Sequence, residues 1–251
     1  MATVAKPSEA AANGWLPAGS LEPRGNPSSV SPLLARVFPP GVTTAELRQA
    51  ADPSMLFPEE ARCLGDAGPT RRQEFAGGRL CARRALAVRA ITHYPLAVNR
   101  DGCPRWPANI IGSITHCAGV CGVVVAGRHQ FRAIGLDVEI VEQVTRDLWP
   151  HVCTPEERVW LAGRRAPEQS QWAALIFSAK ETFYKCQYGL TRQWLDFHDV
   201  TVELESGDLS PGCFTLRPRR GIALLQQGSM PLTGRFEFQG NLIVTGMVIG
   251  S

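Results

Sequence analysis

The sequence of 251 residues predicts a mixed α+β fold, and three observations support this class. Residues 70–91 and 167–188 each carry apolar positions at helical spacing, which predicts two long helices. Short segments rich in β-branched residues lie between these helices and predict strands. Turns are expected at residues 205–208 and 239–241. The last part of the chain is strand-like, with candidate strands at residues 197–204, 212–217, 232–239 and 241–249.

The first part of the chain contains the first long helix. Residues 1–32 are rich in Ala, Pro, Ser, Gly and Asn without periodicity, so we expect a mobile tail. Residues 43–50 predict a short helix, and Pro69-Thr70 begins the long one. Gly77-Gly78 within this helix costs about 1 kcal/mol per glycine relative to alanine. This cost indicates close approach of a neighbouring backbone or a ligand, or a break in the helix.

The middle of the chain predicts strands and a further helix. Residues 109–115 predict a strand that ends at His116. The apolar run 121–126 fits a buried strand or a buried helix, and residues 133–140 predict the next strand. Thr154-Pro155-Glu156-Glu157 predicts a helix start, because Thr is a preferred N-cap, Pro a preferred first residue and Glu the partner of a capping box.

Composition and charge exclude several classes of protein. The chain is 44% hydrophobic and 20% charged, and its formal charge of +3 does not by itself predict nucleic-acid binding. No segment approaches the ~18 consecutive apolar residues that span a bilayer, and residues 1–19 lack the apolar core of a secretory signal. The eight cysteines are scattered without a CxxC pair, so we expect reduced thiols and a cytoplasmic protein. His116, Cys117 and Cys121 lie close together but lack a fourth zinc ligand.

Asp137 and Glu139 lie in a segment, residues 134–140, that reads as a strand. Because side chains on a strand alternate between two faces, both carboxylates share one face. Two adjacent carboxylates repel each other unless a cation lies between them or one of them is protonated. A Mg²⁺ ion with oxygen ligands, shared with a phosphate, would relieve this repulsion. An ordinary edge strand with two solvated acids is the alternative.

Arginines are concentrated in and after the first long helix. Between residues 71 and 105 there are eight arginines, against only Glu74 and Asp101. Arg72, Arg79 and Arg83 lie near one stripe of the helix, and Arg71 borders it. Arginine binds phosphate through planar, bidentate contacts, so this stripe can form a clamp for nucleotide phosphates. A solvated helix face is the alternative.

The polar side of the second long helix carries Lys180, Glu181, Tyr184 and Lys185. Glu181 and Lys185 are spaced i,i+4, which allows a surface ion pair worth a few tenths of a kcal/mol. In the other interpretation, Glu181 completes a metal site and the lysines hold phosphate oxygens. The helix is expected to end at residue 188, with Gly189 at the C′ position. Its apolar stripe is formed by Trp172, Ile176, Ala179 and Phe183.

Five motifs follow one another between residues 60 and 250. They are Arg-x-x-Glu-Phe…Arg-x-Cys-Ala-Arg-x-Ala-Leu (71–86), Pro-x-Trp-Pro (104–107), Gly-Ser-Ile-Thr-His (112–116), Gly-x-Asp-x-Glu (135–139) and Phe-Ser-x-Lys-Glu-x-x-x-Lys (177–185). In this order and at this spacing, they resemble the 4′-phosphopantetheinyl transferases, specifically the long, single-chain surfactin/enterobactin-synthetase type. Gly-x-Asp-x-Glu alone would be a weak signal, whereas all five together are specific.

The resemblance implies a particular arrangement of the α+β fold. Such enzymes are a pseudo-twofold pair of similar α/β halves, with the active site for coenzyme A and Mg²⁺ in the cleft between them. For this chain we expect an N-terminal half at residues 33–130 and a C-terminal half at residues 131–251, after the tail at 1–32. Related single-chain enzymes are usually monomeric, so a monomer is expected.

The resemblance also implies a reaction. These enzymes transfer the phosphopantetheinyl arm of coenzyme A to a serine hydroxyl of an apo acyl carrier or peptidyl carrier protein and release 3′,5′-ADP. The carriers of such enzymes serve nonribosomal peptide, polyketide or siderophore synthesis. Mg²⁺ is the expected metal, and Mn²⁺ is the alternative.

The roles of individual residues follow from their motif positions. Metal ligands and the proposed general base come from the Gly-x-Asp-x-Glu and Lys-Glu motifs, and the basic residues match those that hold the phosphates and the nucleotide end of coenzyme A. Some relatives carry a lysine before the Pro-x-Trp-Pro turn, and Arg100 is its candidate replacement here. The predicted set is catalytic Glu181, His116 and Lys185; cofactor-binding Arg71, Arg79, Arg100, Ser113, His116, Lys180 and Lys185; and metal-binding Asp137, Glu139 and Glu181.

Two alternatives to this reaction are open. A Mg²⁺-dependent hydrolase of a nucleotide pyrophosphate such as coenzyme A would use the same acids and bases, but it would release ADP without a carrier. A catalytically silent carrier-binding module would be expected to lack an acidic ligand or the second lysine, and this sequence has kept them all. The resemblance to the transferases implies that the carrier docks near the segment after Gly-x-Asp-x-Glu, here residues 141–151, where Leu148, Trp149 and Pro150 offer apolar contacts.

Overall fold

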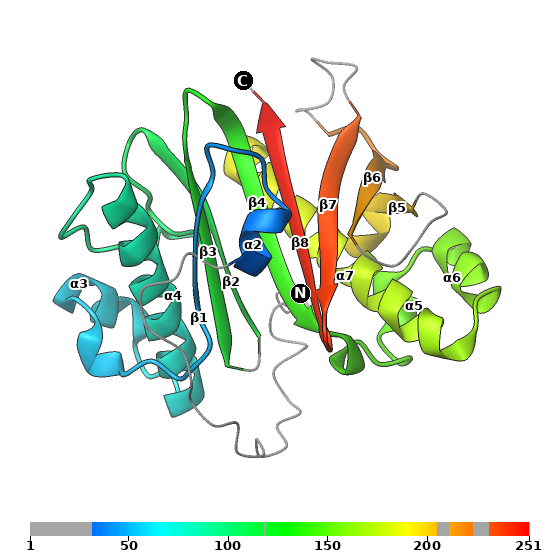
Figure 1. Cartoon of the computed structure of the whole chain (residues 1–251), viewed down its shortest axis with the longest axis horizontal. Helices are drawn as coiled ribbons and strands as arrows, with labels where there is room; N and C mark the ends of the chain where they lie inside the picture. The colour runs from blue at the N-terminus through cyan, green and yellow to red at the C-terminus, as the bar shows by residue number, and fades with distance from the viewer. Residues whose placement is uncertain (1–31, 118, 205–210, 223–230, 251) are drawn as a thin grey trace, which may run out of the picture.

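The computed structural model describes residues 32–117, 119–204, 211–222 and 231–250 (Figure 1). The expected mobile tail, residues 1–32, lies outside the described residues apart from Pro32, and so does the expected turn at 205–208. The described chain combines helices with two antiparallel sheets, which confirms the predicted α+β class.

A three-stranded sheet in the order β1-β3-β2 forms the first half of the molecule. Its strands are β1 (Thr43–Leu47), β2 (Ile110–Cys117) and β3 (Val120–Gly127). The long helix α4 (Pro69–Val88) packs on this sheet, and its buried side chains meet those of β1 and β3 in one apolar cluster. Short elements precede α4, namely η1 (Pro53–Met55), α3 (Pro58–Ala61) and η2 (Arg62–Leu64).

A five-stranded sheet in the order β4-β8-β7-β6-β5 forms the second half. The second long helix, α7 (Ala166–Thr191), packs against β4 and β8. Trp172, Ile176, Ala179 and Phe183 are all buried in the core beneath it, so the predicted apolar stripe is confirmed. The other elements of this half are β4 (Phe131–Ile140), η3 (Val141–Gln143), α5 (Trp149–Val152), α6 (Pro155–Ala162), η4 (Phe197–Asp199), β5 (Val200–Leu204), β6 (Gly212–Pro218), β7 (Leu232–Gln239) and β8 (Leu242–Gly250).

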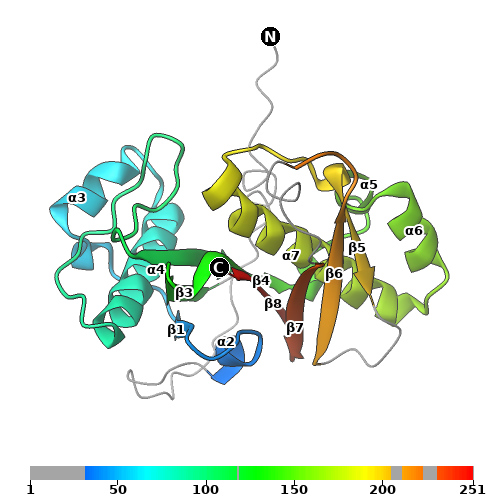
Figure 2. The ribbon, with the colours of Figure 1, turned by 90° about the horizontal axis from the view of Figure 1, so that it is seen from above.

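The two halves meet where β2 runs beside β4, although no strand ladder joins the two sheets (Figure 1). Seen from above, α4 and α7 belong to separate lobes on either side of this junction (Figure 2). The short helix α2 (Pro32–Arg36) crosses the front of the sheets in Figure 1, whereas α7 lies behind them. Leu33, Leu34 and the following Val37 and Phe38 are buried in a cluster that takes residues from both sheets. The N-terminal helix therefore covers the junction from the side opposite α7.

Two predicted elements are wrong. Residues 43–50 are predicted as a helix, but residues 43–47 form β1, which pairs with β3 from Thr43↔Val125 to Leu47↔Cys121. Pairing with β3 buries Ala45 and Leu47 on the α4 side, and this tertiary contact overrides local helix propensity. The second long helix does not end at Gly189 but runs to Thr191, and Arg192 adopts the left-handed conformation at its C-cap (φ 54°).

Other local predictions hold. Thr154 and Glu157 form the expected capping box at the start of α6, and the apolar run 121–126 is a strand rather than a helix. Gly77 lies within an unbroken α4, where an added Cβ would come within 2.5 Å of Cys121 Sγ. The mid-helix glycine is therefore explained by the close approach of β3, and not by a break.

Candidate active site

The site forms where β4 lies against α7. Gly135 permits this contact, because a Cβ there would come within 2.1 Å of the Thr182 carbonyl oxygen on α7. Asp137 and Glu139 follow at period two, so they share the face of β4 that looks toward the helix, while Leu136 and Val138 enter the opposite core. The glycine of the Gly-x-Asp-x-Glu motif thus sets the helix close enough for its side chains to reach the carboxylates.

Asp137 is the most completely bonded of the three acids. It is 1% exposed, and its Oδ1 accepts hydrogen bonds from Lys185 Nζ at 2.6 Å and Thr115 Oγ1 at 3.1 Å. Its Oδ2 accepts from Ser178 Oγ at 2.8 Å. These donors come from β2 and α7, so Asp137 links the two halves of the molecule.

The surroundings of Glu139 and Glu181 disfavour the ionised form of both carboxyl groups. Burial, followed by the Asp137 charge and, more weakly, that of Glu181, holds the pKa of Glu139 well above its ordinary value. Burial raises the pKa of Glu181 to about 6, and Asp137 adds to this effect while Lys185 opposes it. Among the described residues, no group of three or more His, Cys, Asp and Glu side chains lies in an arrangement that could hold a metal ion as it stands.

Lys185 is the cation of this site. Burial alone would lower the pKa of Lys185, but Asp137, Glu181 and Glu139 together raise it above its ordinary value. The ammonium group is therefore charged at neutral pH, and it binds Asp137 directly while the charges of Glu181 and Glu139 also act on it. The structure brings together four predicted site residues here: Asp137, Glu139, Glu181 and Lys185.

His116 lies on the α4 side of the junction. Arg71 Nη1 is 3.0 Å from His116 Nε2, and Glu74 Oε2 is 3.6 Å from its Nδ1. Burial, and then the charges of Arg71 and Lys185, lower the pKa of His116, while Glu74 and Asp137 oppose the shift. His116 and Arg71 are thus neighbours, and Lys185 is close enough to influence His116.

Ser113 has a different position from the one expected. Its hydroxyl is buried and accepts a hydrogen bond from the Leu136 backbone N–H at 3.1 Å. Thr115 Oγ1, two residues along β2, likewise accepts from Val138 N at 3.2 Å. These two hydroxyls replace strand-to-strand hydrogen bonds between β2 and β4, so Ser113 joins the two halves rather than facing open space.

Lys180 does not lie with the acids. Its side chain is 1% exposed and forms an ion pair with Glu157 at 2.7 Å. The ammonium also donates to the carbonyl oxygens of Val152 at 2.9 Å and Phe197 at 3.0 Å. An ammonium group has three protons, and all three have partners here. All three donors of Lys180 are thus used within the protein, and its contact with a coenzyme A phosphate stays a prediction from its motif position.

The remaining basic candidates differ in exposure. Arg79 is 5% exposed, lies over the Phe75 ring at 3.6 Å and donates from Nε to the Leu96 carbonyl at 3.1 Å. Burial lowers its pKa to about 10, and its Nη2 is buried without a hydrogen-bond partner among the described residues. Arg100 is exposed in the turn that also contains Asp101. Asp101 accepts a hydrogen bond from Arg192 at 2.6 Å, so this turn touches the end of α7.

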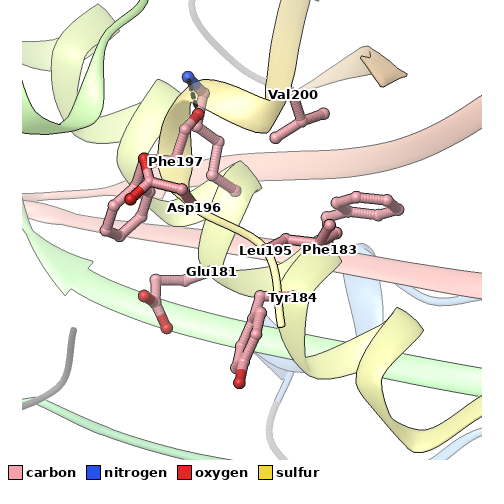
Figure 3. A pocket seen from close by; sticks show the side chains of 8 residues that line it. Glu181, Phe183, Tyr184, Leu195, Asp196, Phe197 and Val200 are labelled. Atoms are coloured by element: carbon pink, nitrogen blue, oxygen red, sulfur yellow. Dashed lines mark hydrogen bonds between the residues drawn. The ribbon is translucent and has the colours of Figure 1, made fainter. Parts of the chain in front are cut away.

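A pocket opens beside Glu181 (Figure 3). One side comes from α7, and the other comes from the segment that follows it, residues 195–200. It contains about 310 Å³ of space, part of which is open to solvent. Its lining is mostly apolar, and it consists of Lys180, Glu181, Phe183, Tyr184, Leu195, Asp196, Phe197 and Val200.

Several polar residues around the acids are absent from the predicted site. Ser178 belongs to a motif but has no predicted role, although Ser178, Thr182 and Lys185 lie at i, i+4 and i+7 on one helix face. Thr182 Oγ1 is 2.7 Å from Thr245 Oγ1, which in turn is 2.8 Å from Ser178 Oγ. The helical spacing of Ser178, Thr182 and Lys185 is visible in the sequence and could have indicated a shared polar face. The contact with Thr245 could not be predicted in this way, because Thr245 lies in β8 at the far end of the chain.

The segment expected to dock carriers, residues 141–151, follows β4 directly. Trp149 is only half-buried, but it packs against the apolar core of the second half. Its indole N–H donates to the Val144 carbonyl at 3.3 Å. Arg146 is exposed, donates to Gln169 at 2.7 Å and lies 5.3 Å from the Trp149 ring centroid. Trp149 therefore serves the core at least in part, while Arg146 is open to a partner.

The fold and the site define a class: a two-half α+β enzyme whose acids, lysine and histidine collect at the junction of the halves, as in a transferase. The family pattern of the 4′-phosphopantetheinyl transferase N-terminal domain matches residues 59–126, and that of the 4′-phosphopantetheinyl transferase superfamily matches residues 133–223. The chain belongs to the 4′-phosphopantetheinyl transferase superfamily, as the five motifs indicated.

Full-length relatives agree with this membership. The chain is 34% identical to the 4′-phosphopantetheinyl transferase Npt of Nocardia iowensis, over 86% of this chain and 97% of that protein. It is 33% identical to the 4′-phosphopantetheinyl transferase PptT of Mycobacterium tuberculosis, over 88% of this chain and 100% of that protein. A shorter match, 36% identical over 49% of this chain and 57% of the relative, is to enterobactin synthase component D of Escherichia coli.

No helix of the described residues is both long and apolar enough to cross a membrane.

The predicted boundary between the halves, at residues 130 and 131, falls between the end of β3 at Gly127 and the start of β4 at Phe131.

Proposed function

We propose that this 4′-phosphopantetheinyl transferase moves the arm of coenzyme A to a serine hydroxyl of an apo acyl or peptidyl carrier protein and releases 3′,5′-ADP. The observation that carries the proposal is the grouping of Asp137, Glu139, Glu181 and Lys185 at the junction, beside a pocket that opens at Glu181. The proposal extends to a monomer acting in the cytoplasm, as expected from the sequence.

The donor set suits a divalent cation. Asp137, Glu139 and Glu181 offer carboxylate oxygens, the ligands that Mg²⁺ prefers, and Mn²⁺ accepts the same ligands. The pKa of Glu139 and that of Glu181 are raised partly by neighbouring negative charge, which a cation would relieve. When bound by these residues, Mg²⁺ would neutralise charge on the pyrophosphate of coenzyme A.

Glu181 is the proposed general base. The serine oxygen forms a bond to the β-phosphorus of coenzyme A, and the bond from that phosphorus to the departing 3′,5′-ADP oxygen breaks. The serine proton must leave as this happens, and Glu181 lies at the pocket where the arm would meet it (Figure 3). With a pKa of about 6, its carboxylate is mostly ionised at neutral pH and can accept that proton.

Lys185 and His116 are proposed to stabilise the phosphates. The Lys185 ammonium is charged because its pKa is raised, and a phosphate oxygen would share its protons with Asp137. Arg71 and His116 are in contact across the junction from Lys185, so together they can hold the oxygens on which negative charge grows.

The nucleotide end is proposed to lie on the α4 side. The orphaned Nη2 of Arg79 supports this placement, because a buried guanidinium nitrogen without an acceptor is costly and a phosphate oxygen would satisfy it. Arg71 and the exposed Arg100 supply further positive charge in the same half. The arm would then extend across the junction into the mostly apolar pocket of the other half.

The test is the intact mass of an apo carrier protein after incubation with this protein, coenzyme A and Mg²⁺. One added phosphopantetheinyl group, abolished by EDTA, is the expected result. The panel should include acyl carrier proteins and peptidyl carriers from siderophore, polyketide and nonribosomal peptide synthesis. An unmodified panel would overturn the proposal, and ADP release without carrier modification would identify a coenzyme A hydrolase instead.

A further inference from the structure

Lys180 and Glu157 form a closed polar node inside the second half. Glu157 is 3% exposed, and its Oε2 accepts from the Thr154 backbone N–H and from Lys180 Nζ, each at 2.7 Å. Its Oε1 accepts from the Val202 backbone N–H at 2.7 Å. Every proton of the ammonium and both oxygens of the carboxylate therefore have partners, which is the condition under which a buried charge pair is tolerated.

The node fastens one wall of the pocket. Residues 195–200 supply four of the eight lining residues. This segment is tied to α7 through the bond from Lys180 Nζ to the Phe197 carbonyl, drawn dashed in Figure 3, and to α6 through the bond from Val202 N to Glu157. Phe197 also stacks on Phe177 of α7, with ring centroids 5.5 Å apart. The two backbone ties lie on either side of Val200, so they fix the wall at both ends.

Lys180 is also next to the proposed base. Glu181 follows it directly on α7, and both residues line the same pocket. Lys180 points into the protein and holds the facing wall, whereas Glu181 belongs to the group of acids around Lys185. The lysine side chain therefore connects the helix that carries the proposed base to the opposite wall.

We propose that the Lys180–Glu157 pair is a positioning device that sets the pocket wall at residues 195–200 for the arm of coenzyme A, while its charged groups bind only to the protein. This inference rests on the proposed function, because it takes the arm as the occupant of the pocket. The pair acts only on the second half, while the basic candidates for the nucleotide end, Arg71 and Arg79, belong to α4 in the first half. Disturbing the node should therefore weaken binding of the arm and spare binding of the nucleotide.

The experiment compares two ligands by titration calorimetry in the presence of Mg²⁺. Coenzyme A carries the arm, and 3′,5′-ADP lacks it. In Lys180→Met and in Glu157→Gln, coenzyme A should bind about tenfold or more weakly, because ligand contacts are sensitive to displacements on the order of 1 Å. The affinity for 3′,5′-ADP should stay within about twofold of the wild-type value, which is ~0.4 kcal/mol.

Glu156→Gln is the matched control. Glu156 precedes Glu157 and forms an exposed ion pair with Arg219 at 2.6 Å, so this variant removes a neighbouring charge pair without disturbing the node. Both affinities should remain at the wild-type level. Glu157→Gln is the milder of the two node variants, since its amide oxygen can still accept one of the backbone hydrogen bonds. If Lys180→Met does not fold, the comparison is made with Glu157→Gln alone.

Three outcomes would overturn the inference. Equal weakening of both ligands would mean that the pair supports the fold in general, and unchanged coenzyme A affinity would mean that the wall does not depend on it. Wild-type protein that binds the two ligands equally would show that the arm does not use the pocket. Carrier loading by the wild-type protein is measured in parallel, so a failure of the transferase proposal is seen separately from a failure of the positioning role.

Discussion

The two halves of the molecule contain the same polar node, built with a different cation. In the first half, Glu60 Oε2 accepts from the Phe57 N–H at 2.9 Å, and Glu60 Oε1 accepts from the Leu96 N–H at 2.9 Å. In the second half, Glu157 accepts from Thr154 and Val202 in the same way. Each glutamate is the third residue of a helix that begins with proline, and each binds a backbone N–H in the segment that follows the long helix of its half, from Leu96 in the first half and from Val202 of β5 in the second.

The cations show where the halves diverge. Arg83 of α4 reaches Glu60 at 3.2 Å and keeps 22% of its side chain exposed, and it also donates to the Met55 carbonyl at 2.6 Å. Lys180 of α7 is 1% exposed and uses its other protons on Val152 and Phe197. The first node is thus partly exposed to solvent, whereas the second is buried and binds the backbone of a pocket wall. The same framework is a scaffold in the first half and, on the proposed function, supports the substrate site in the second.

The largest expected effect concerns the acid that only the second half supplies. Glu181→Gln should lower kcat for carrier loading by about 10²–10⁴-fold, because the amide cannot act as a general base. The measurement is the rate of carrier mass gain at saturating coenzyme A. Glu60→Gln is the comparison, because this buried glutamate of the first half supports the framework but lies outside the proposed chemistry. If both variants lost kcat equally while remaining folded, the division of roles between the halves would be wrong.

The second prediction sets the two nodes directly against each other. Lys180→Met leaves the Glu157 carboxylate buried without its cation and should destabilise the fold by about 3–5 kcal/mol, the usual cost of breaking a buried pair. Arg83→Met should cost less, on the order of 1–2 kcal/mol, because water can reach the partly exposed first node. Urea denaturation followed by circular dichroism gives both values. Equal losses would show that exposure does not distinguish the two nodes.

The sequence predicted the chemistry better than the framework. Asp137, Glu139, Glu181 and Lys185 were found from strand and helix periodicity together with the family motifs, because residues close in sequence share a face through local geometry alone. The repeated x-Pro-Glu-Glu at residues 57–60 and 154–157 was also present to be read, but only the second copy was recognised as a helix start.

Contacts between distant segments could not be read in this way. Lys180 and Ser113 match motif positions, yet their partners Glu157 and Leu136 come from other elements, so these contacts do not follow from local periodicity. The strand β1 was predicted as a helix for the same reason, since its pairing partner β3 lies far along the chain. Periodicity identifies a face of an element, and the fold decides what that face meets.

The third prediction concerns the charge repulsion that sets the site apart from the first half. A carboxyl whose pKa is raised to about 6 in the folded protein, against 4.5 ordinarily, favours folding while protonated, and this contribution is lost as pH rises from about 4.5 through 6. In metal-free protein at pH 7, Glu181→Gln should therefore increase the free energy of unfolding by about 1–2 kcal/mol. At pH 4 the two proteins should differ little.

Urea denaturation of both proteins at the two pH values, with EDTA present, gives this difference. Mg²⁺ should reverse its sign at pH 7, because a bound cation stabilises the wild-type protein and the variant lacks a ligand. A stabilising effect of Glu181→Gln that is the same at pH 4 and pH 7 would contradict the repulsion as its cause.

The fourth prediction tests which half meets the carrier protein. Arg146→Glu in residues 141–151 should raise the KM for an acidic carrier by roughly three- to tenfold with little change in kcat, because charges at the rim of an interface mainly alter association. Arg128→Glu, an exposed arginine in the turn after β3, is the matched charge reversal in the first half. Steady-state loading rates at varied carrier concentration measure both. A greater effect of Arg128→Glu would move the docking surface to the first half.

The smallest effect is expected where the halves touch at the surface. Asp101 and Arg192 join the turn at residues 99–102 to the end of α7 at 2.6 Å, but their side chains are 30% and 52% exposed. Asp101→Asn should therefore cost only about 0–1 kcal/mol of unfolding free energy, and the loss should shrink further in 1 M salt. Thr115→Val, which removes a buried bond to Asp137 at the same junction, should cost more, on the order of 1–3 kcal/mol, and should be insensitive to salt. If Asp101→Asn were the more damaging of the two in urea denaturation, the halves would be held together by their rim charges rather than by the buried hydroxyls of β2.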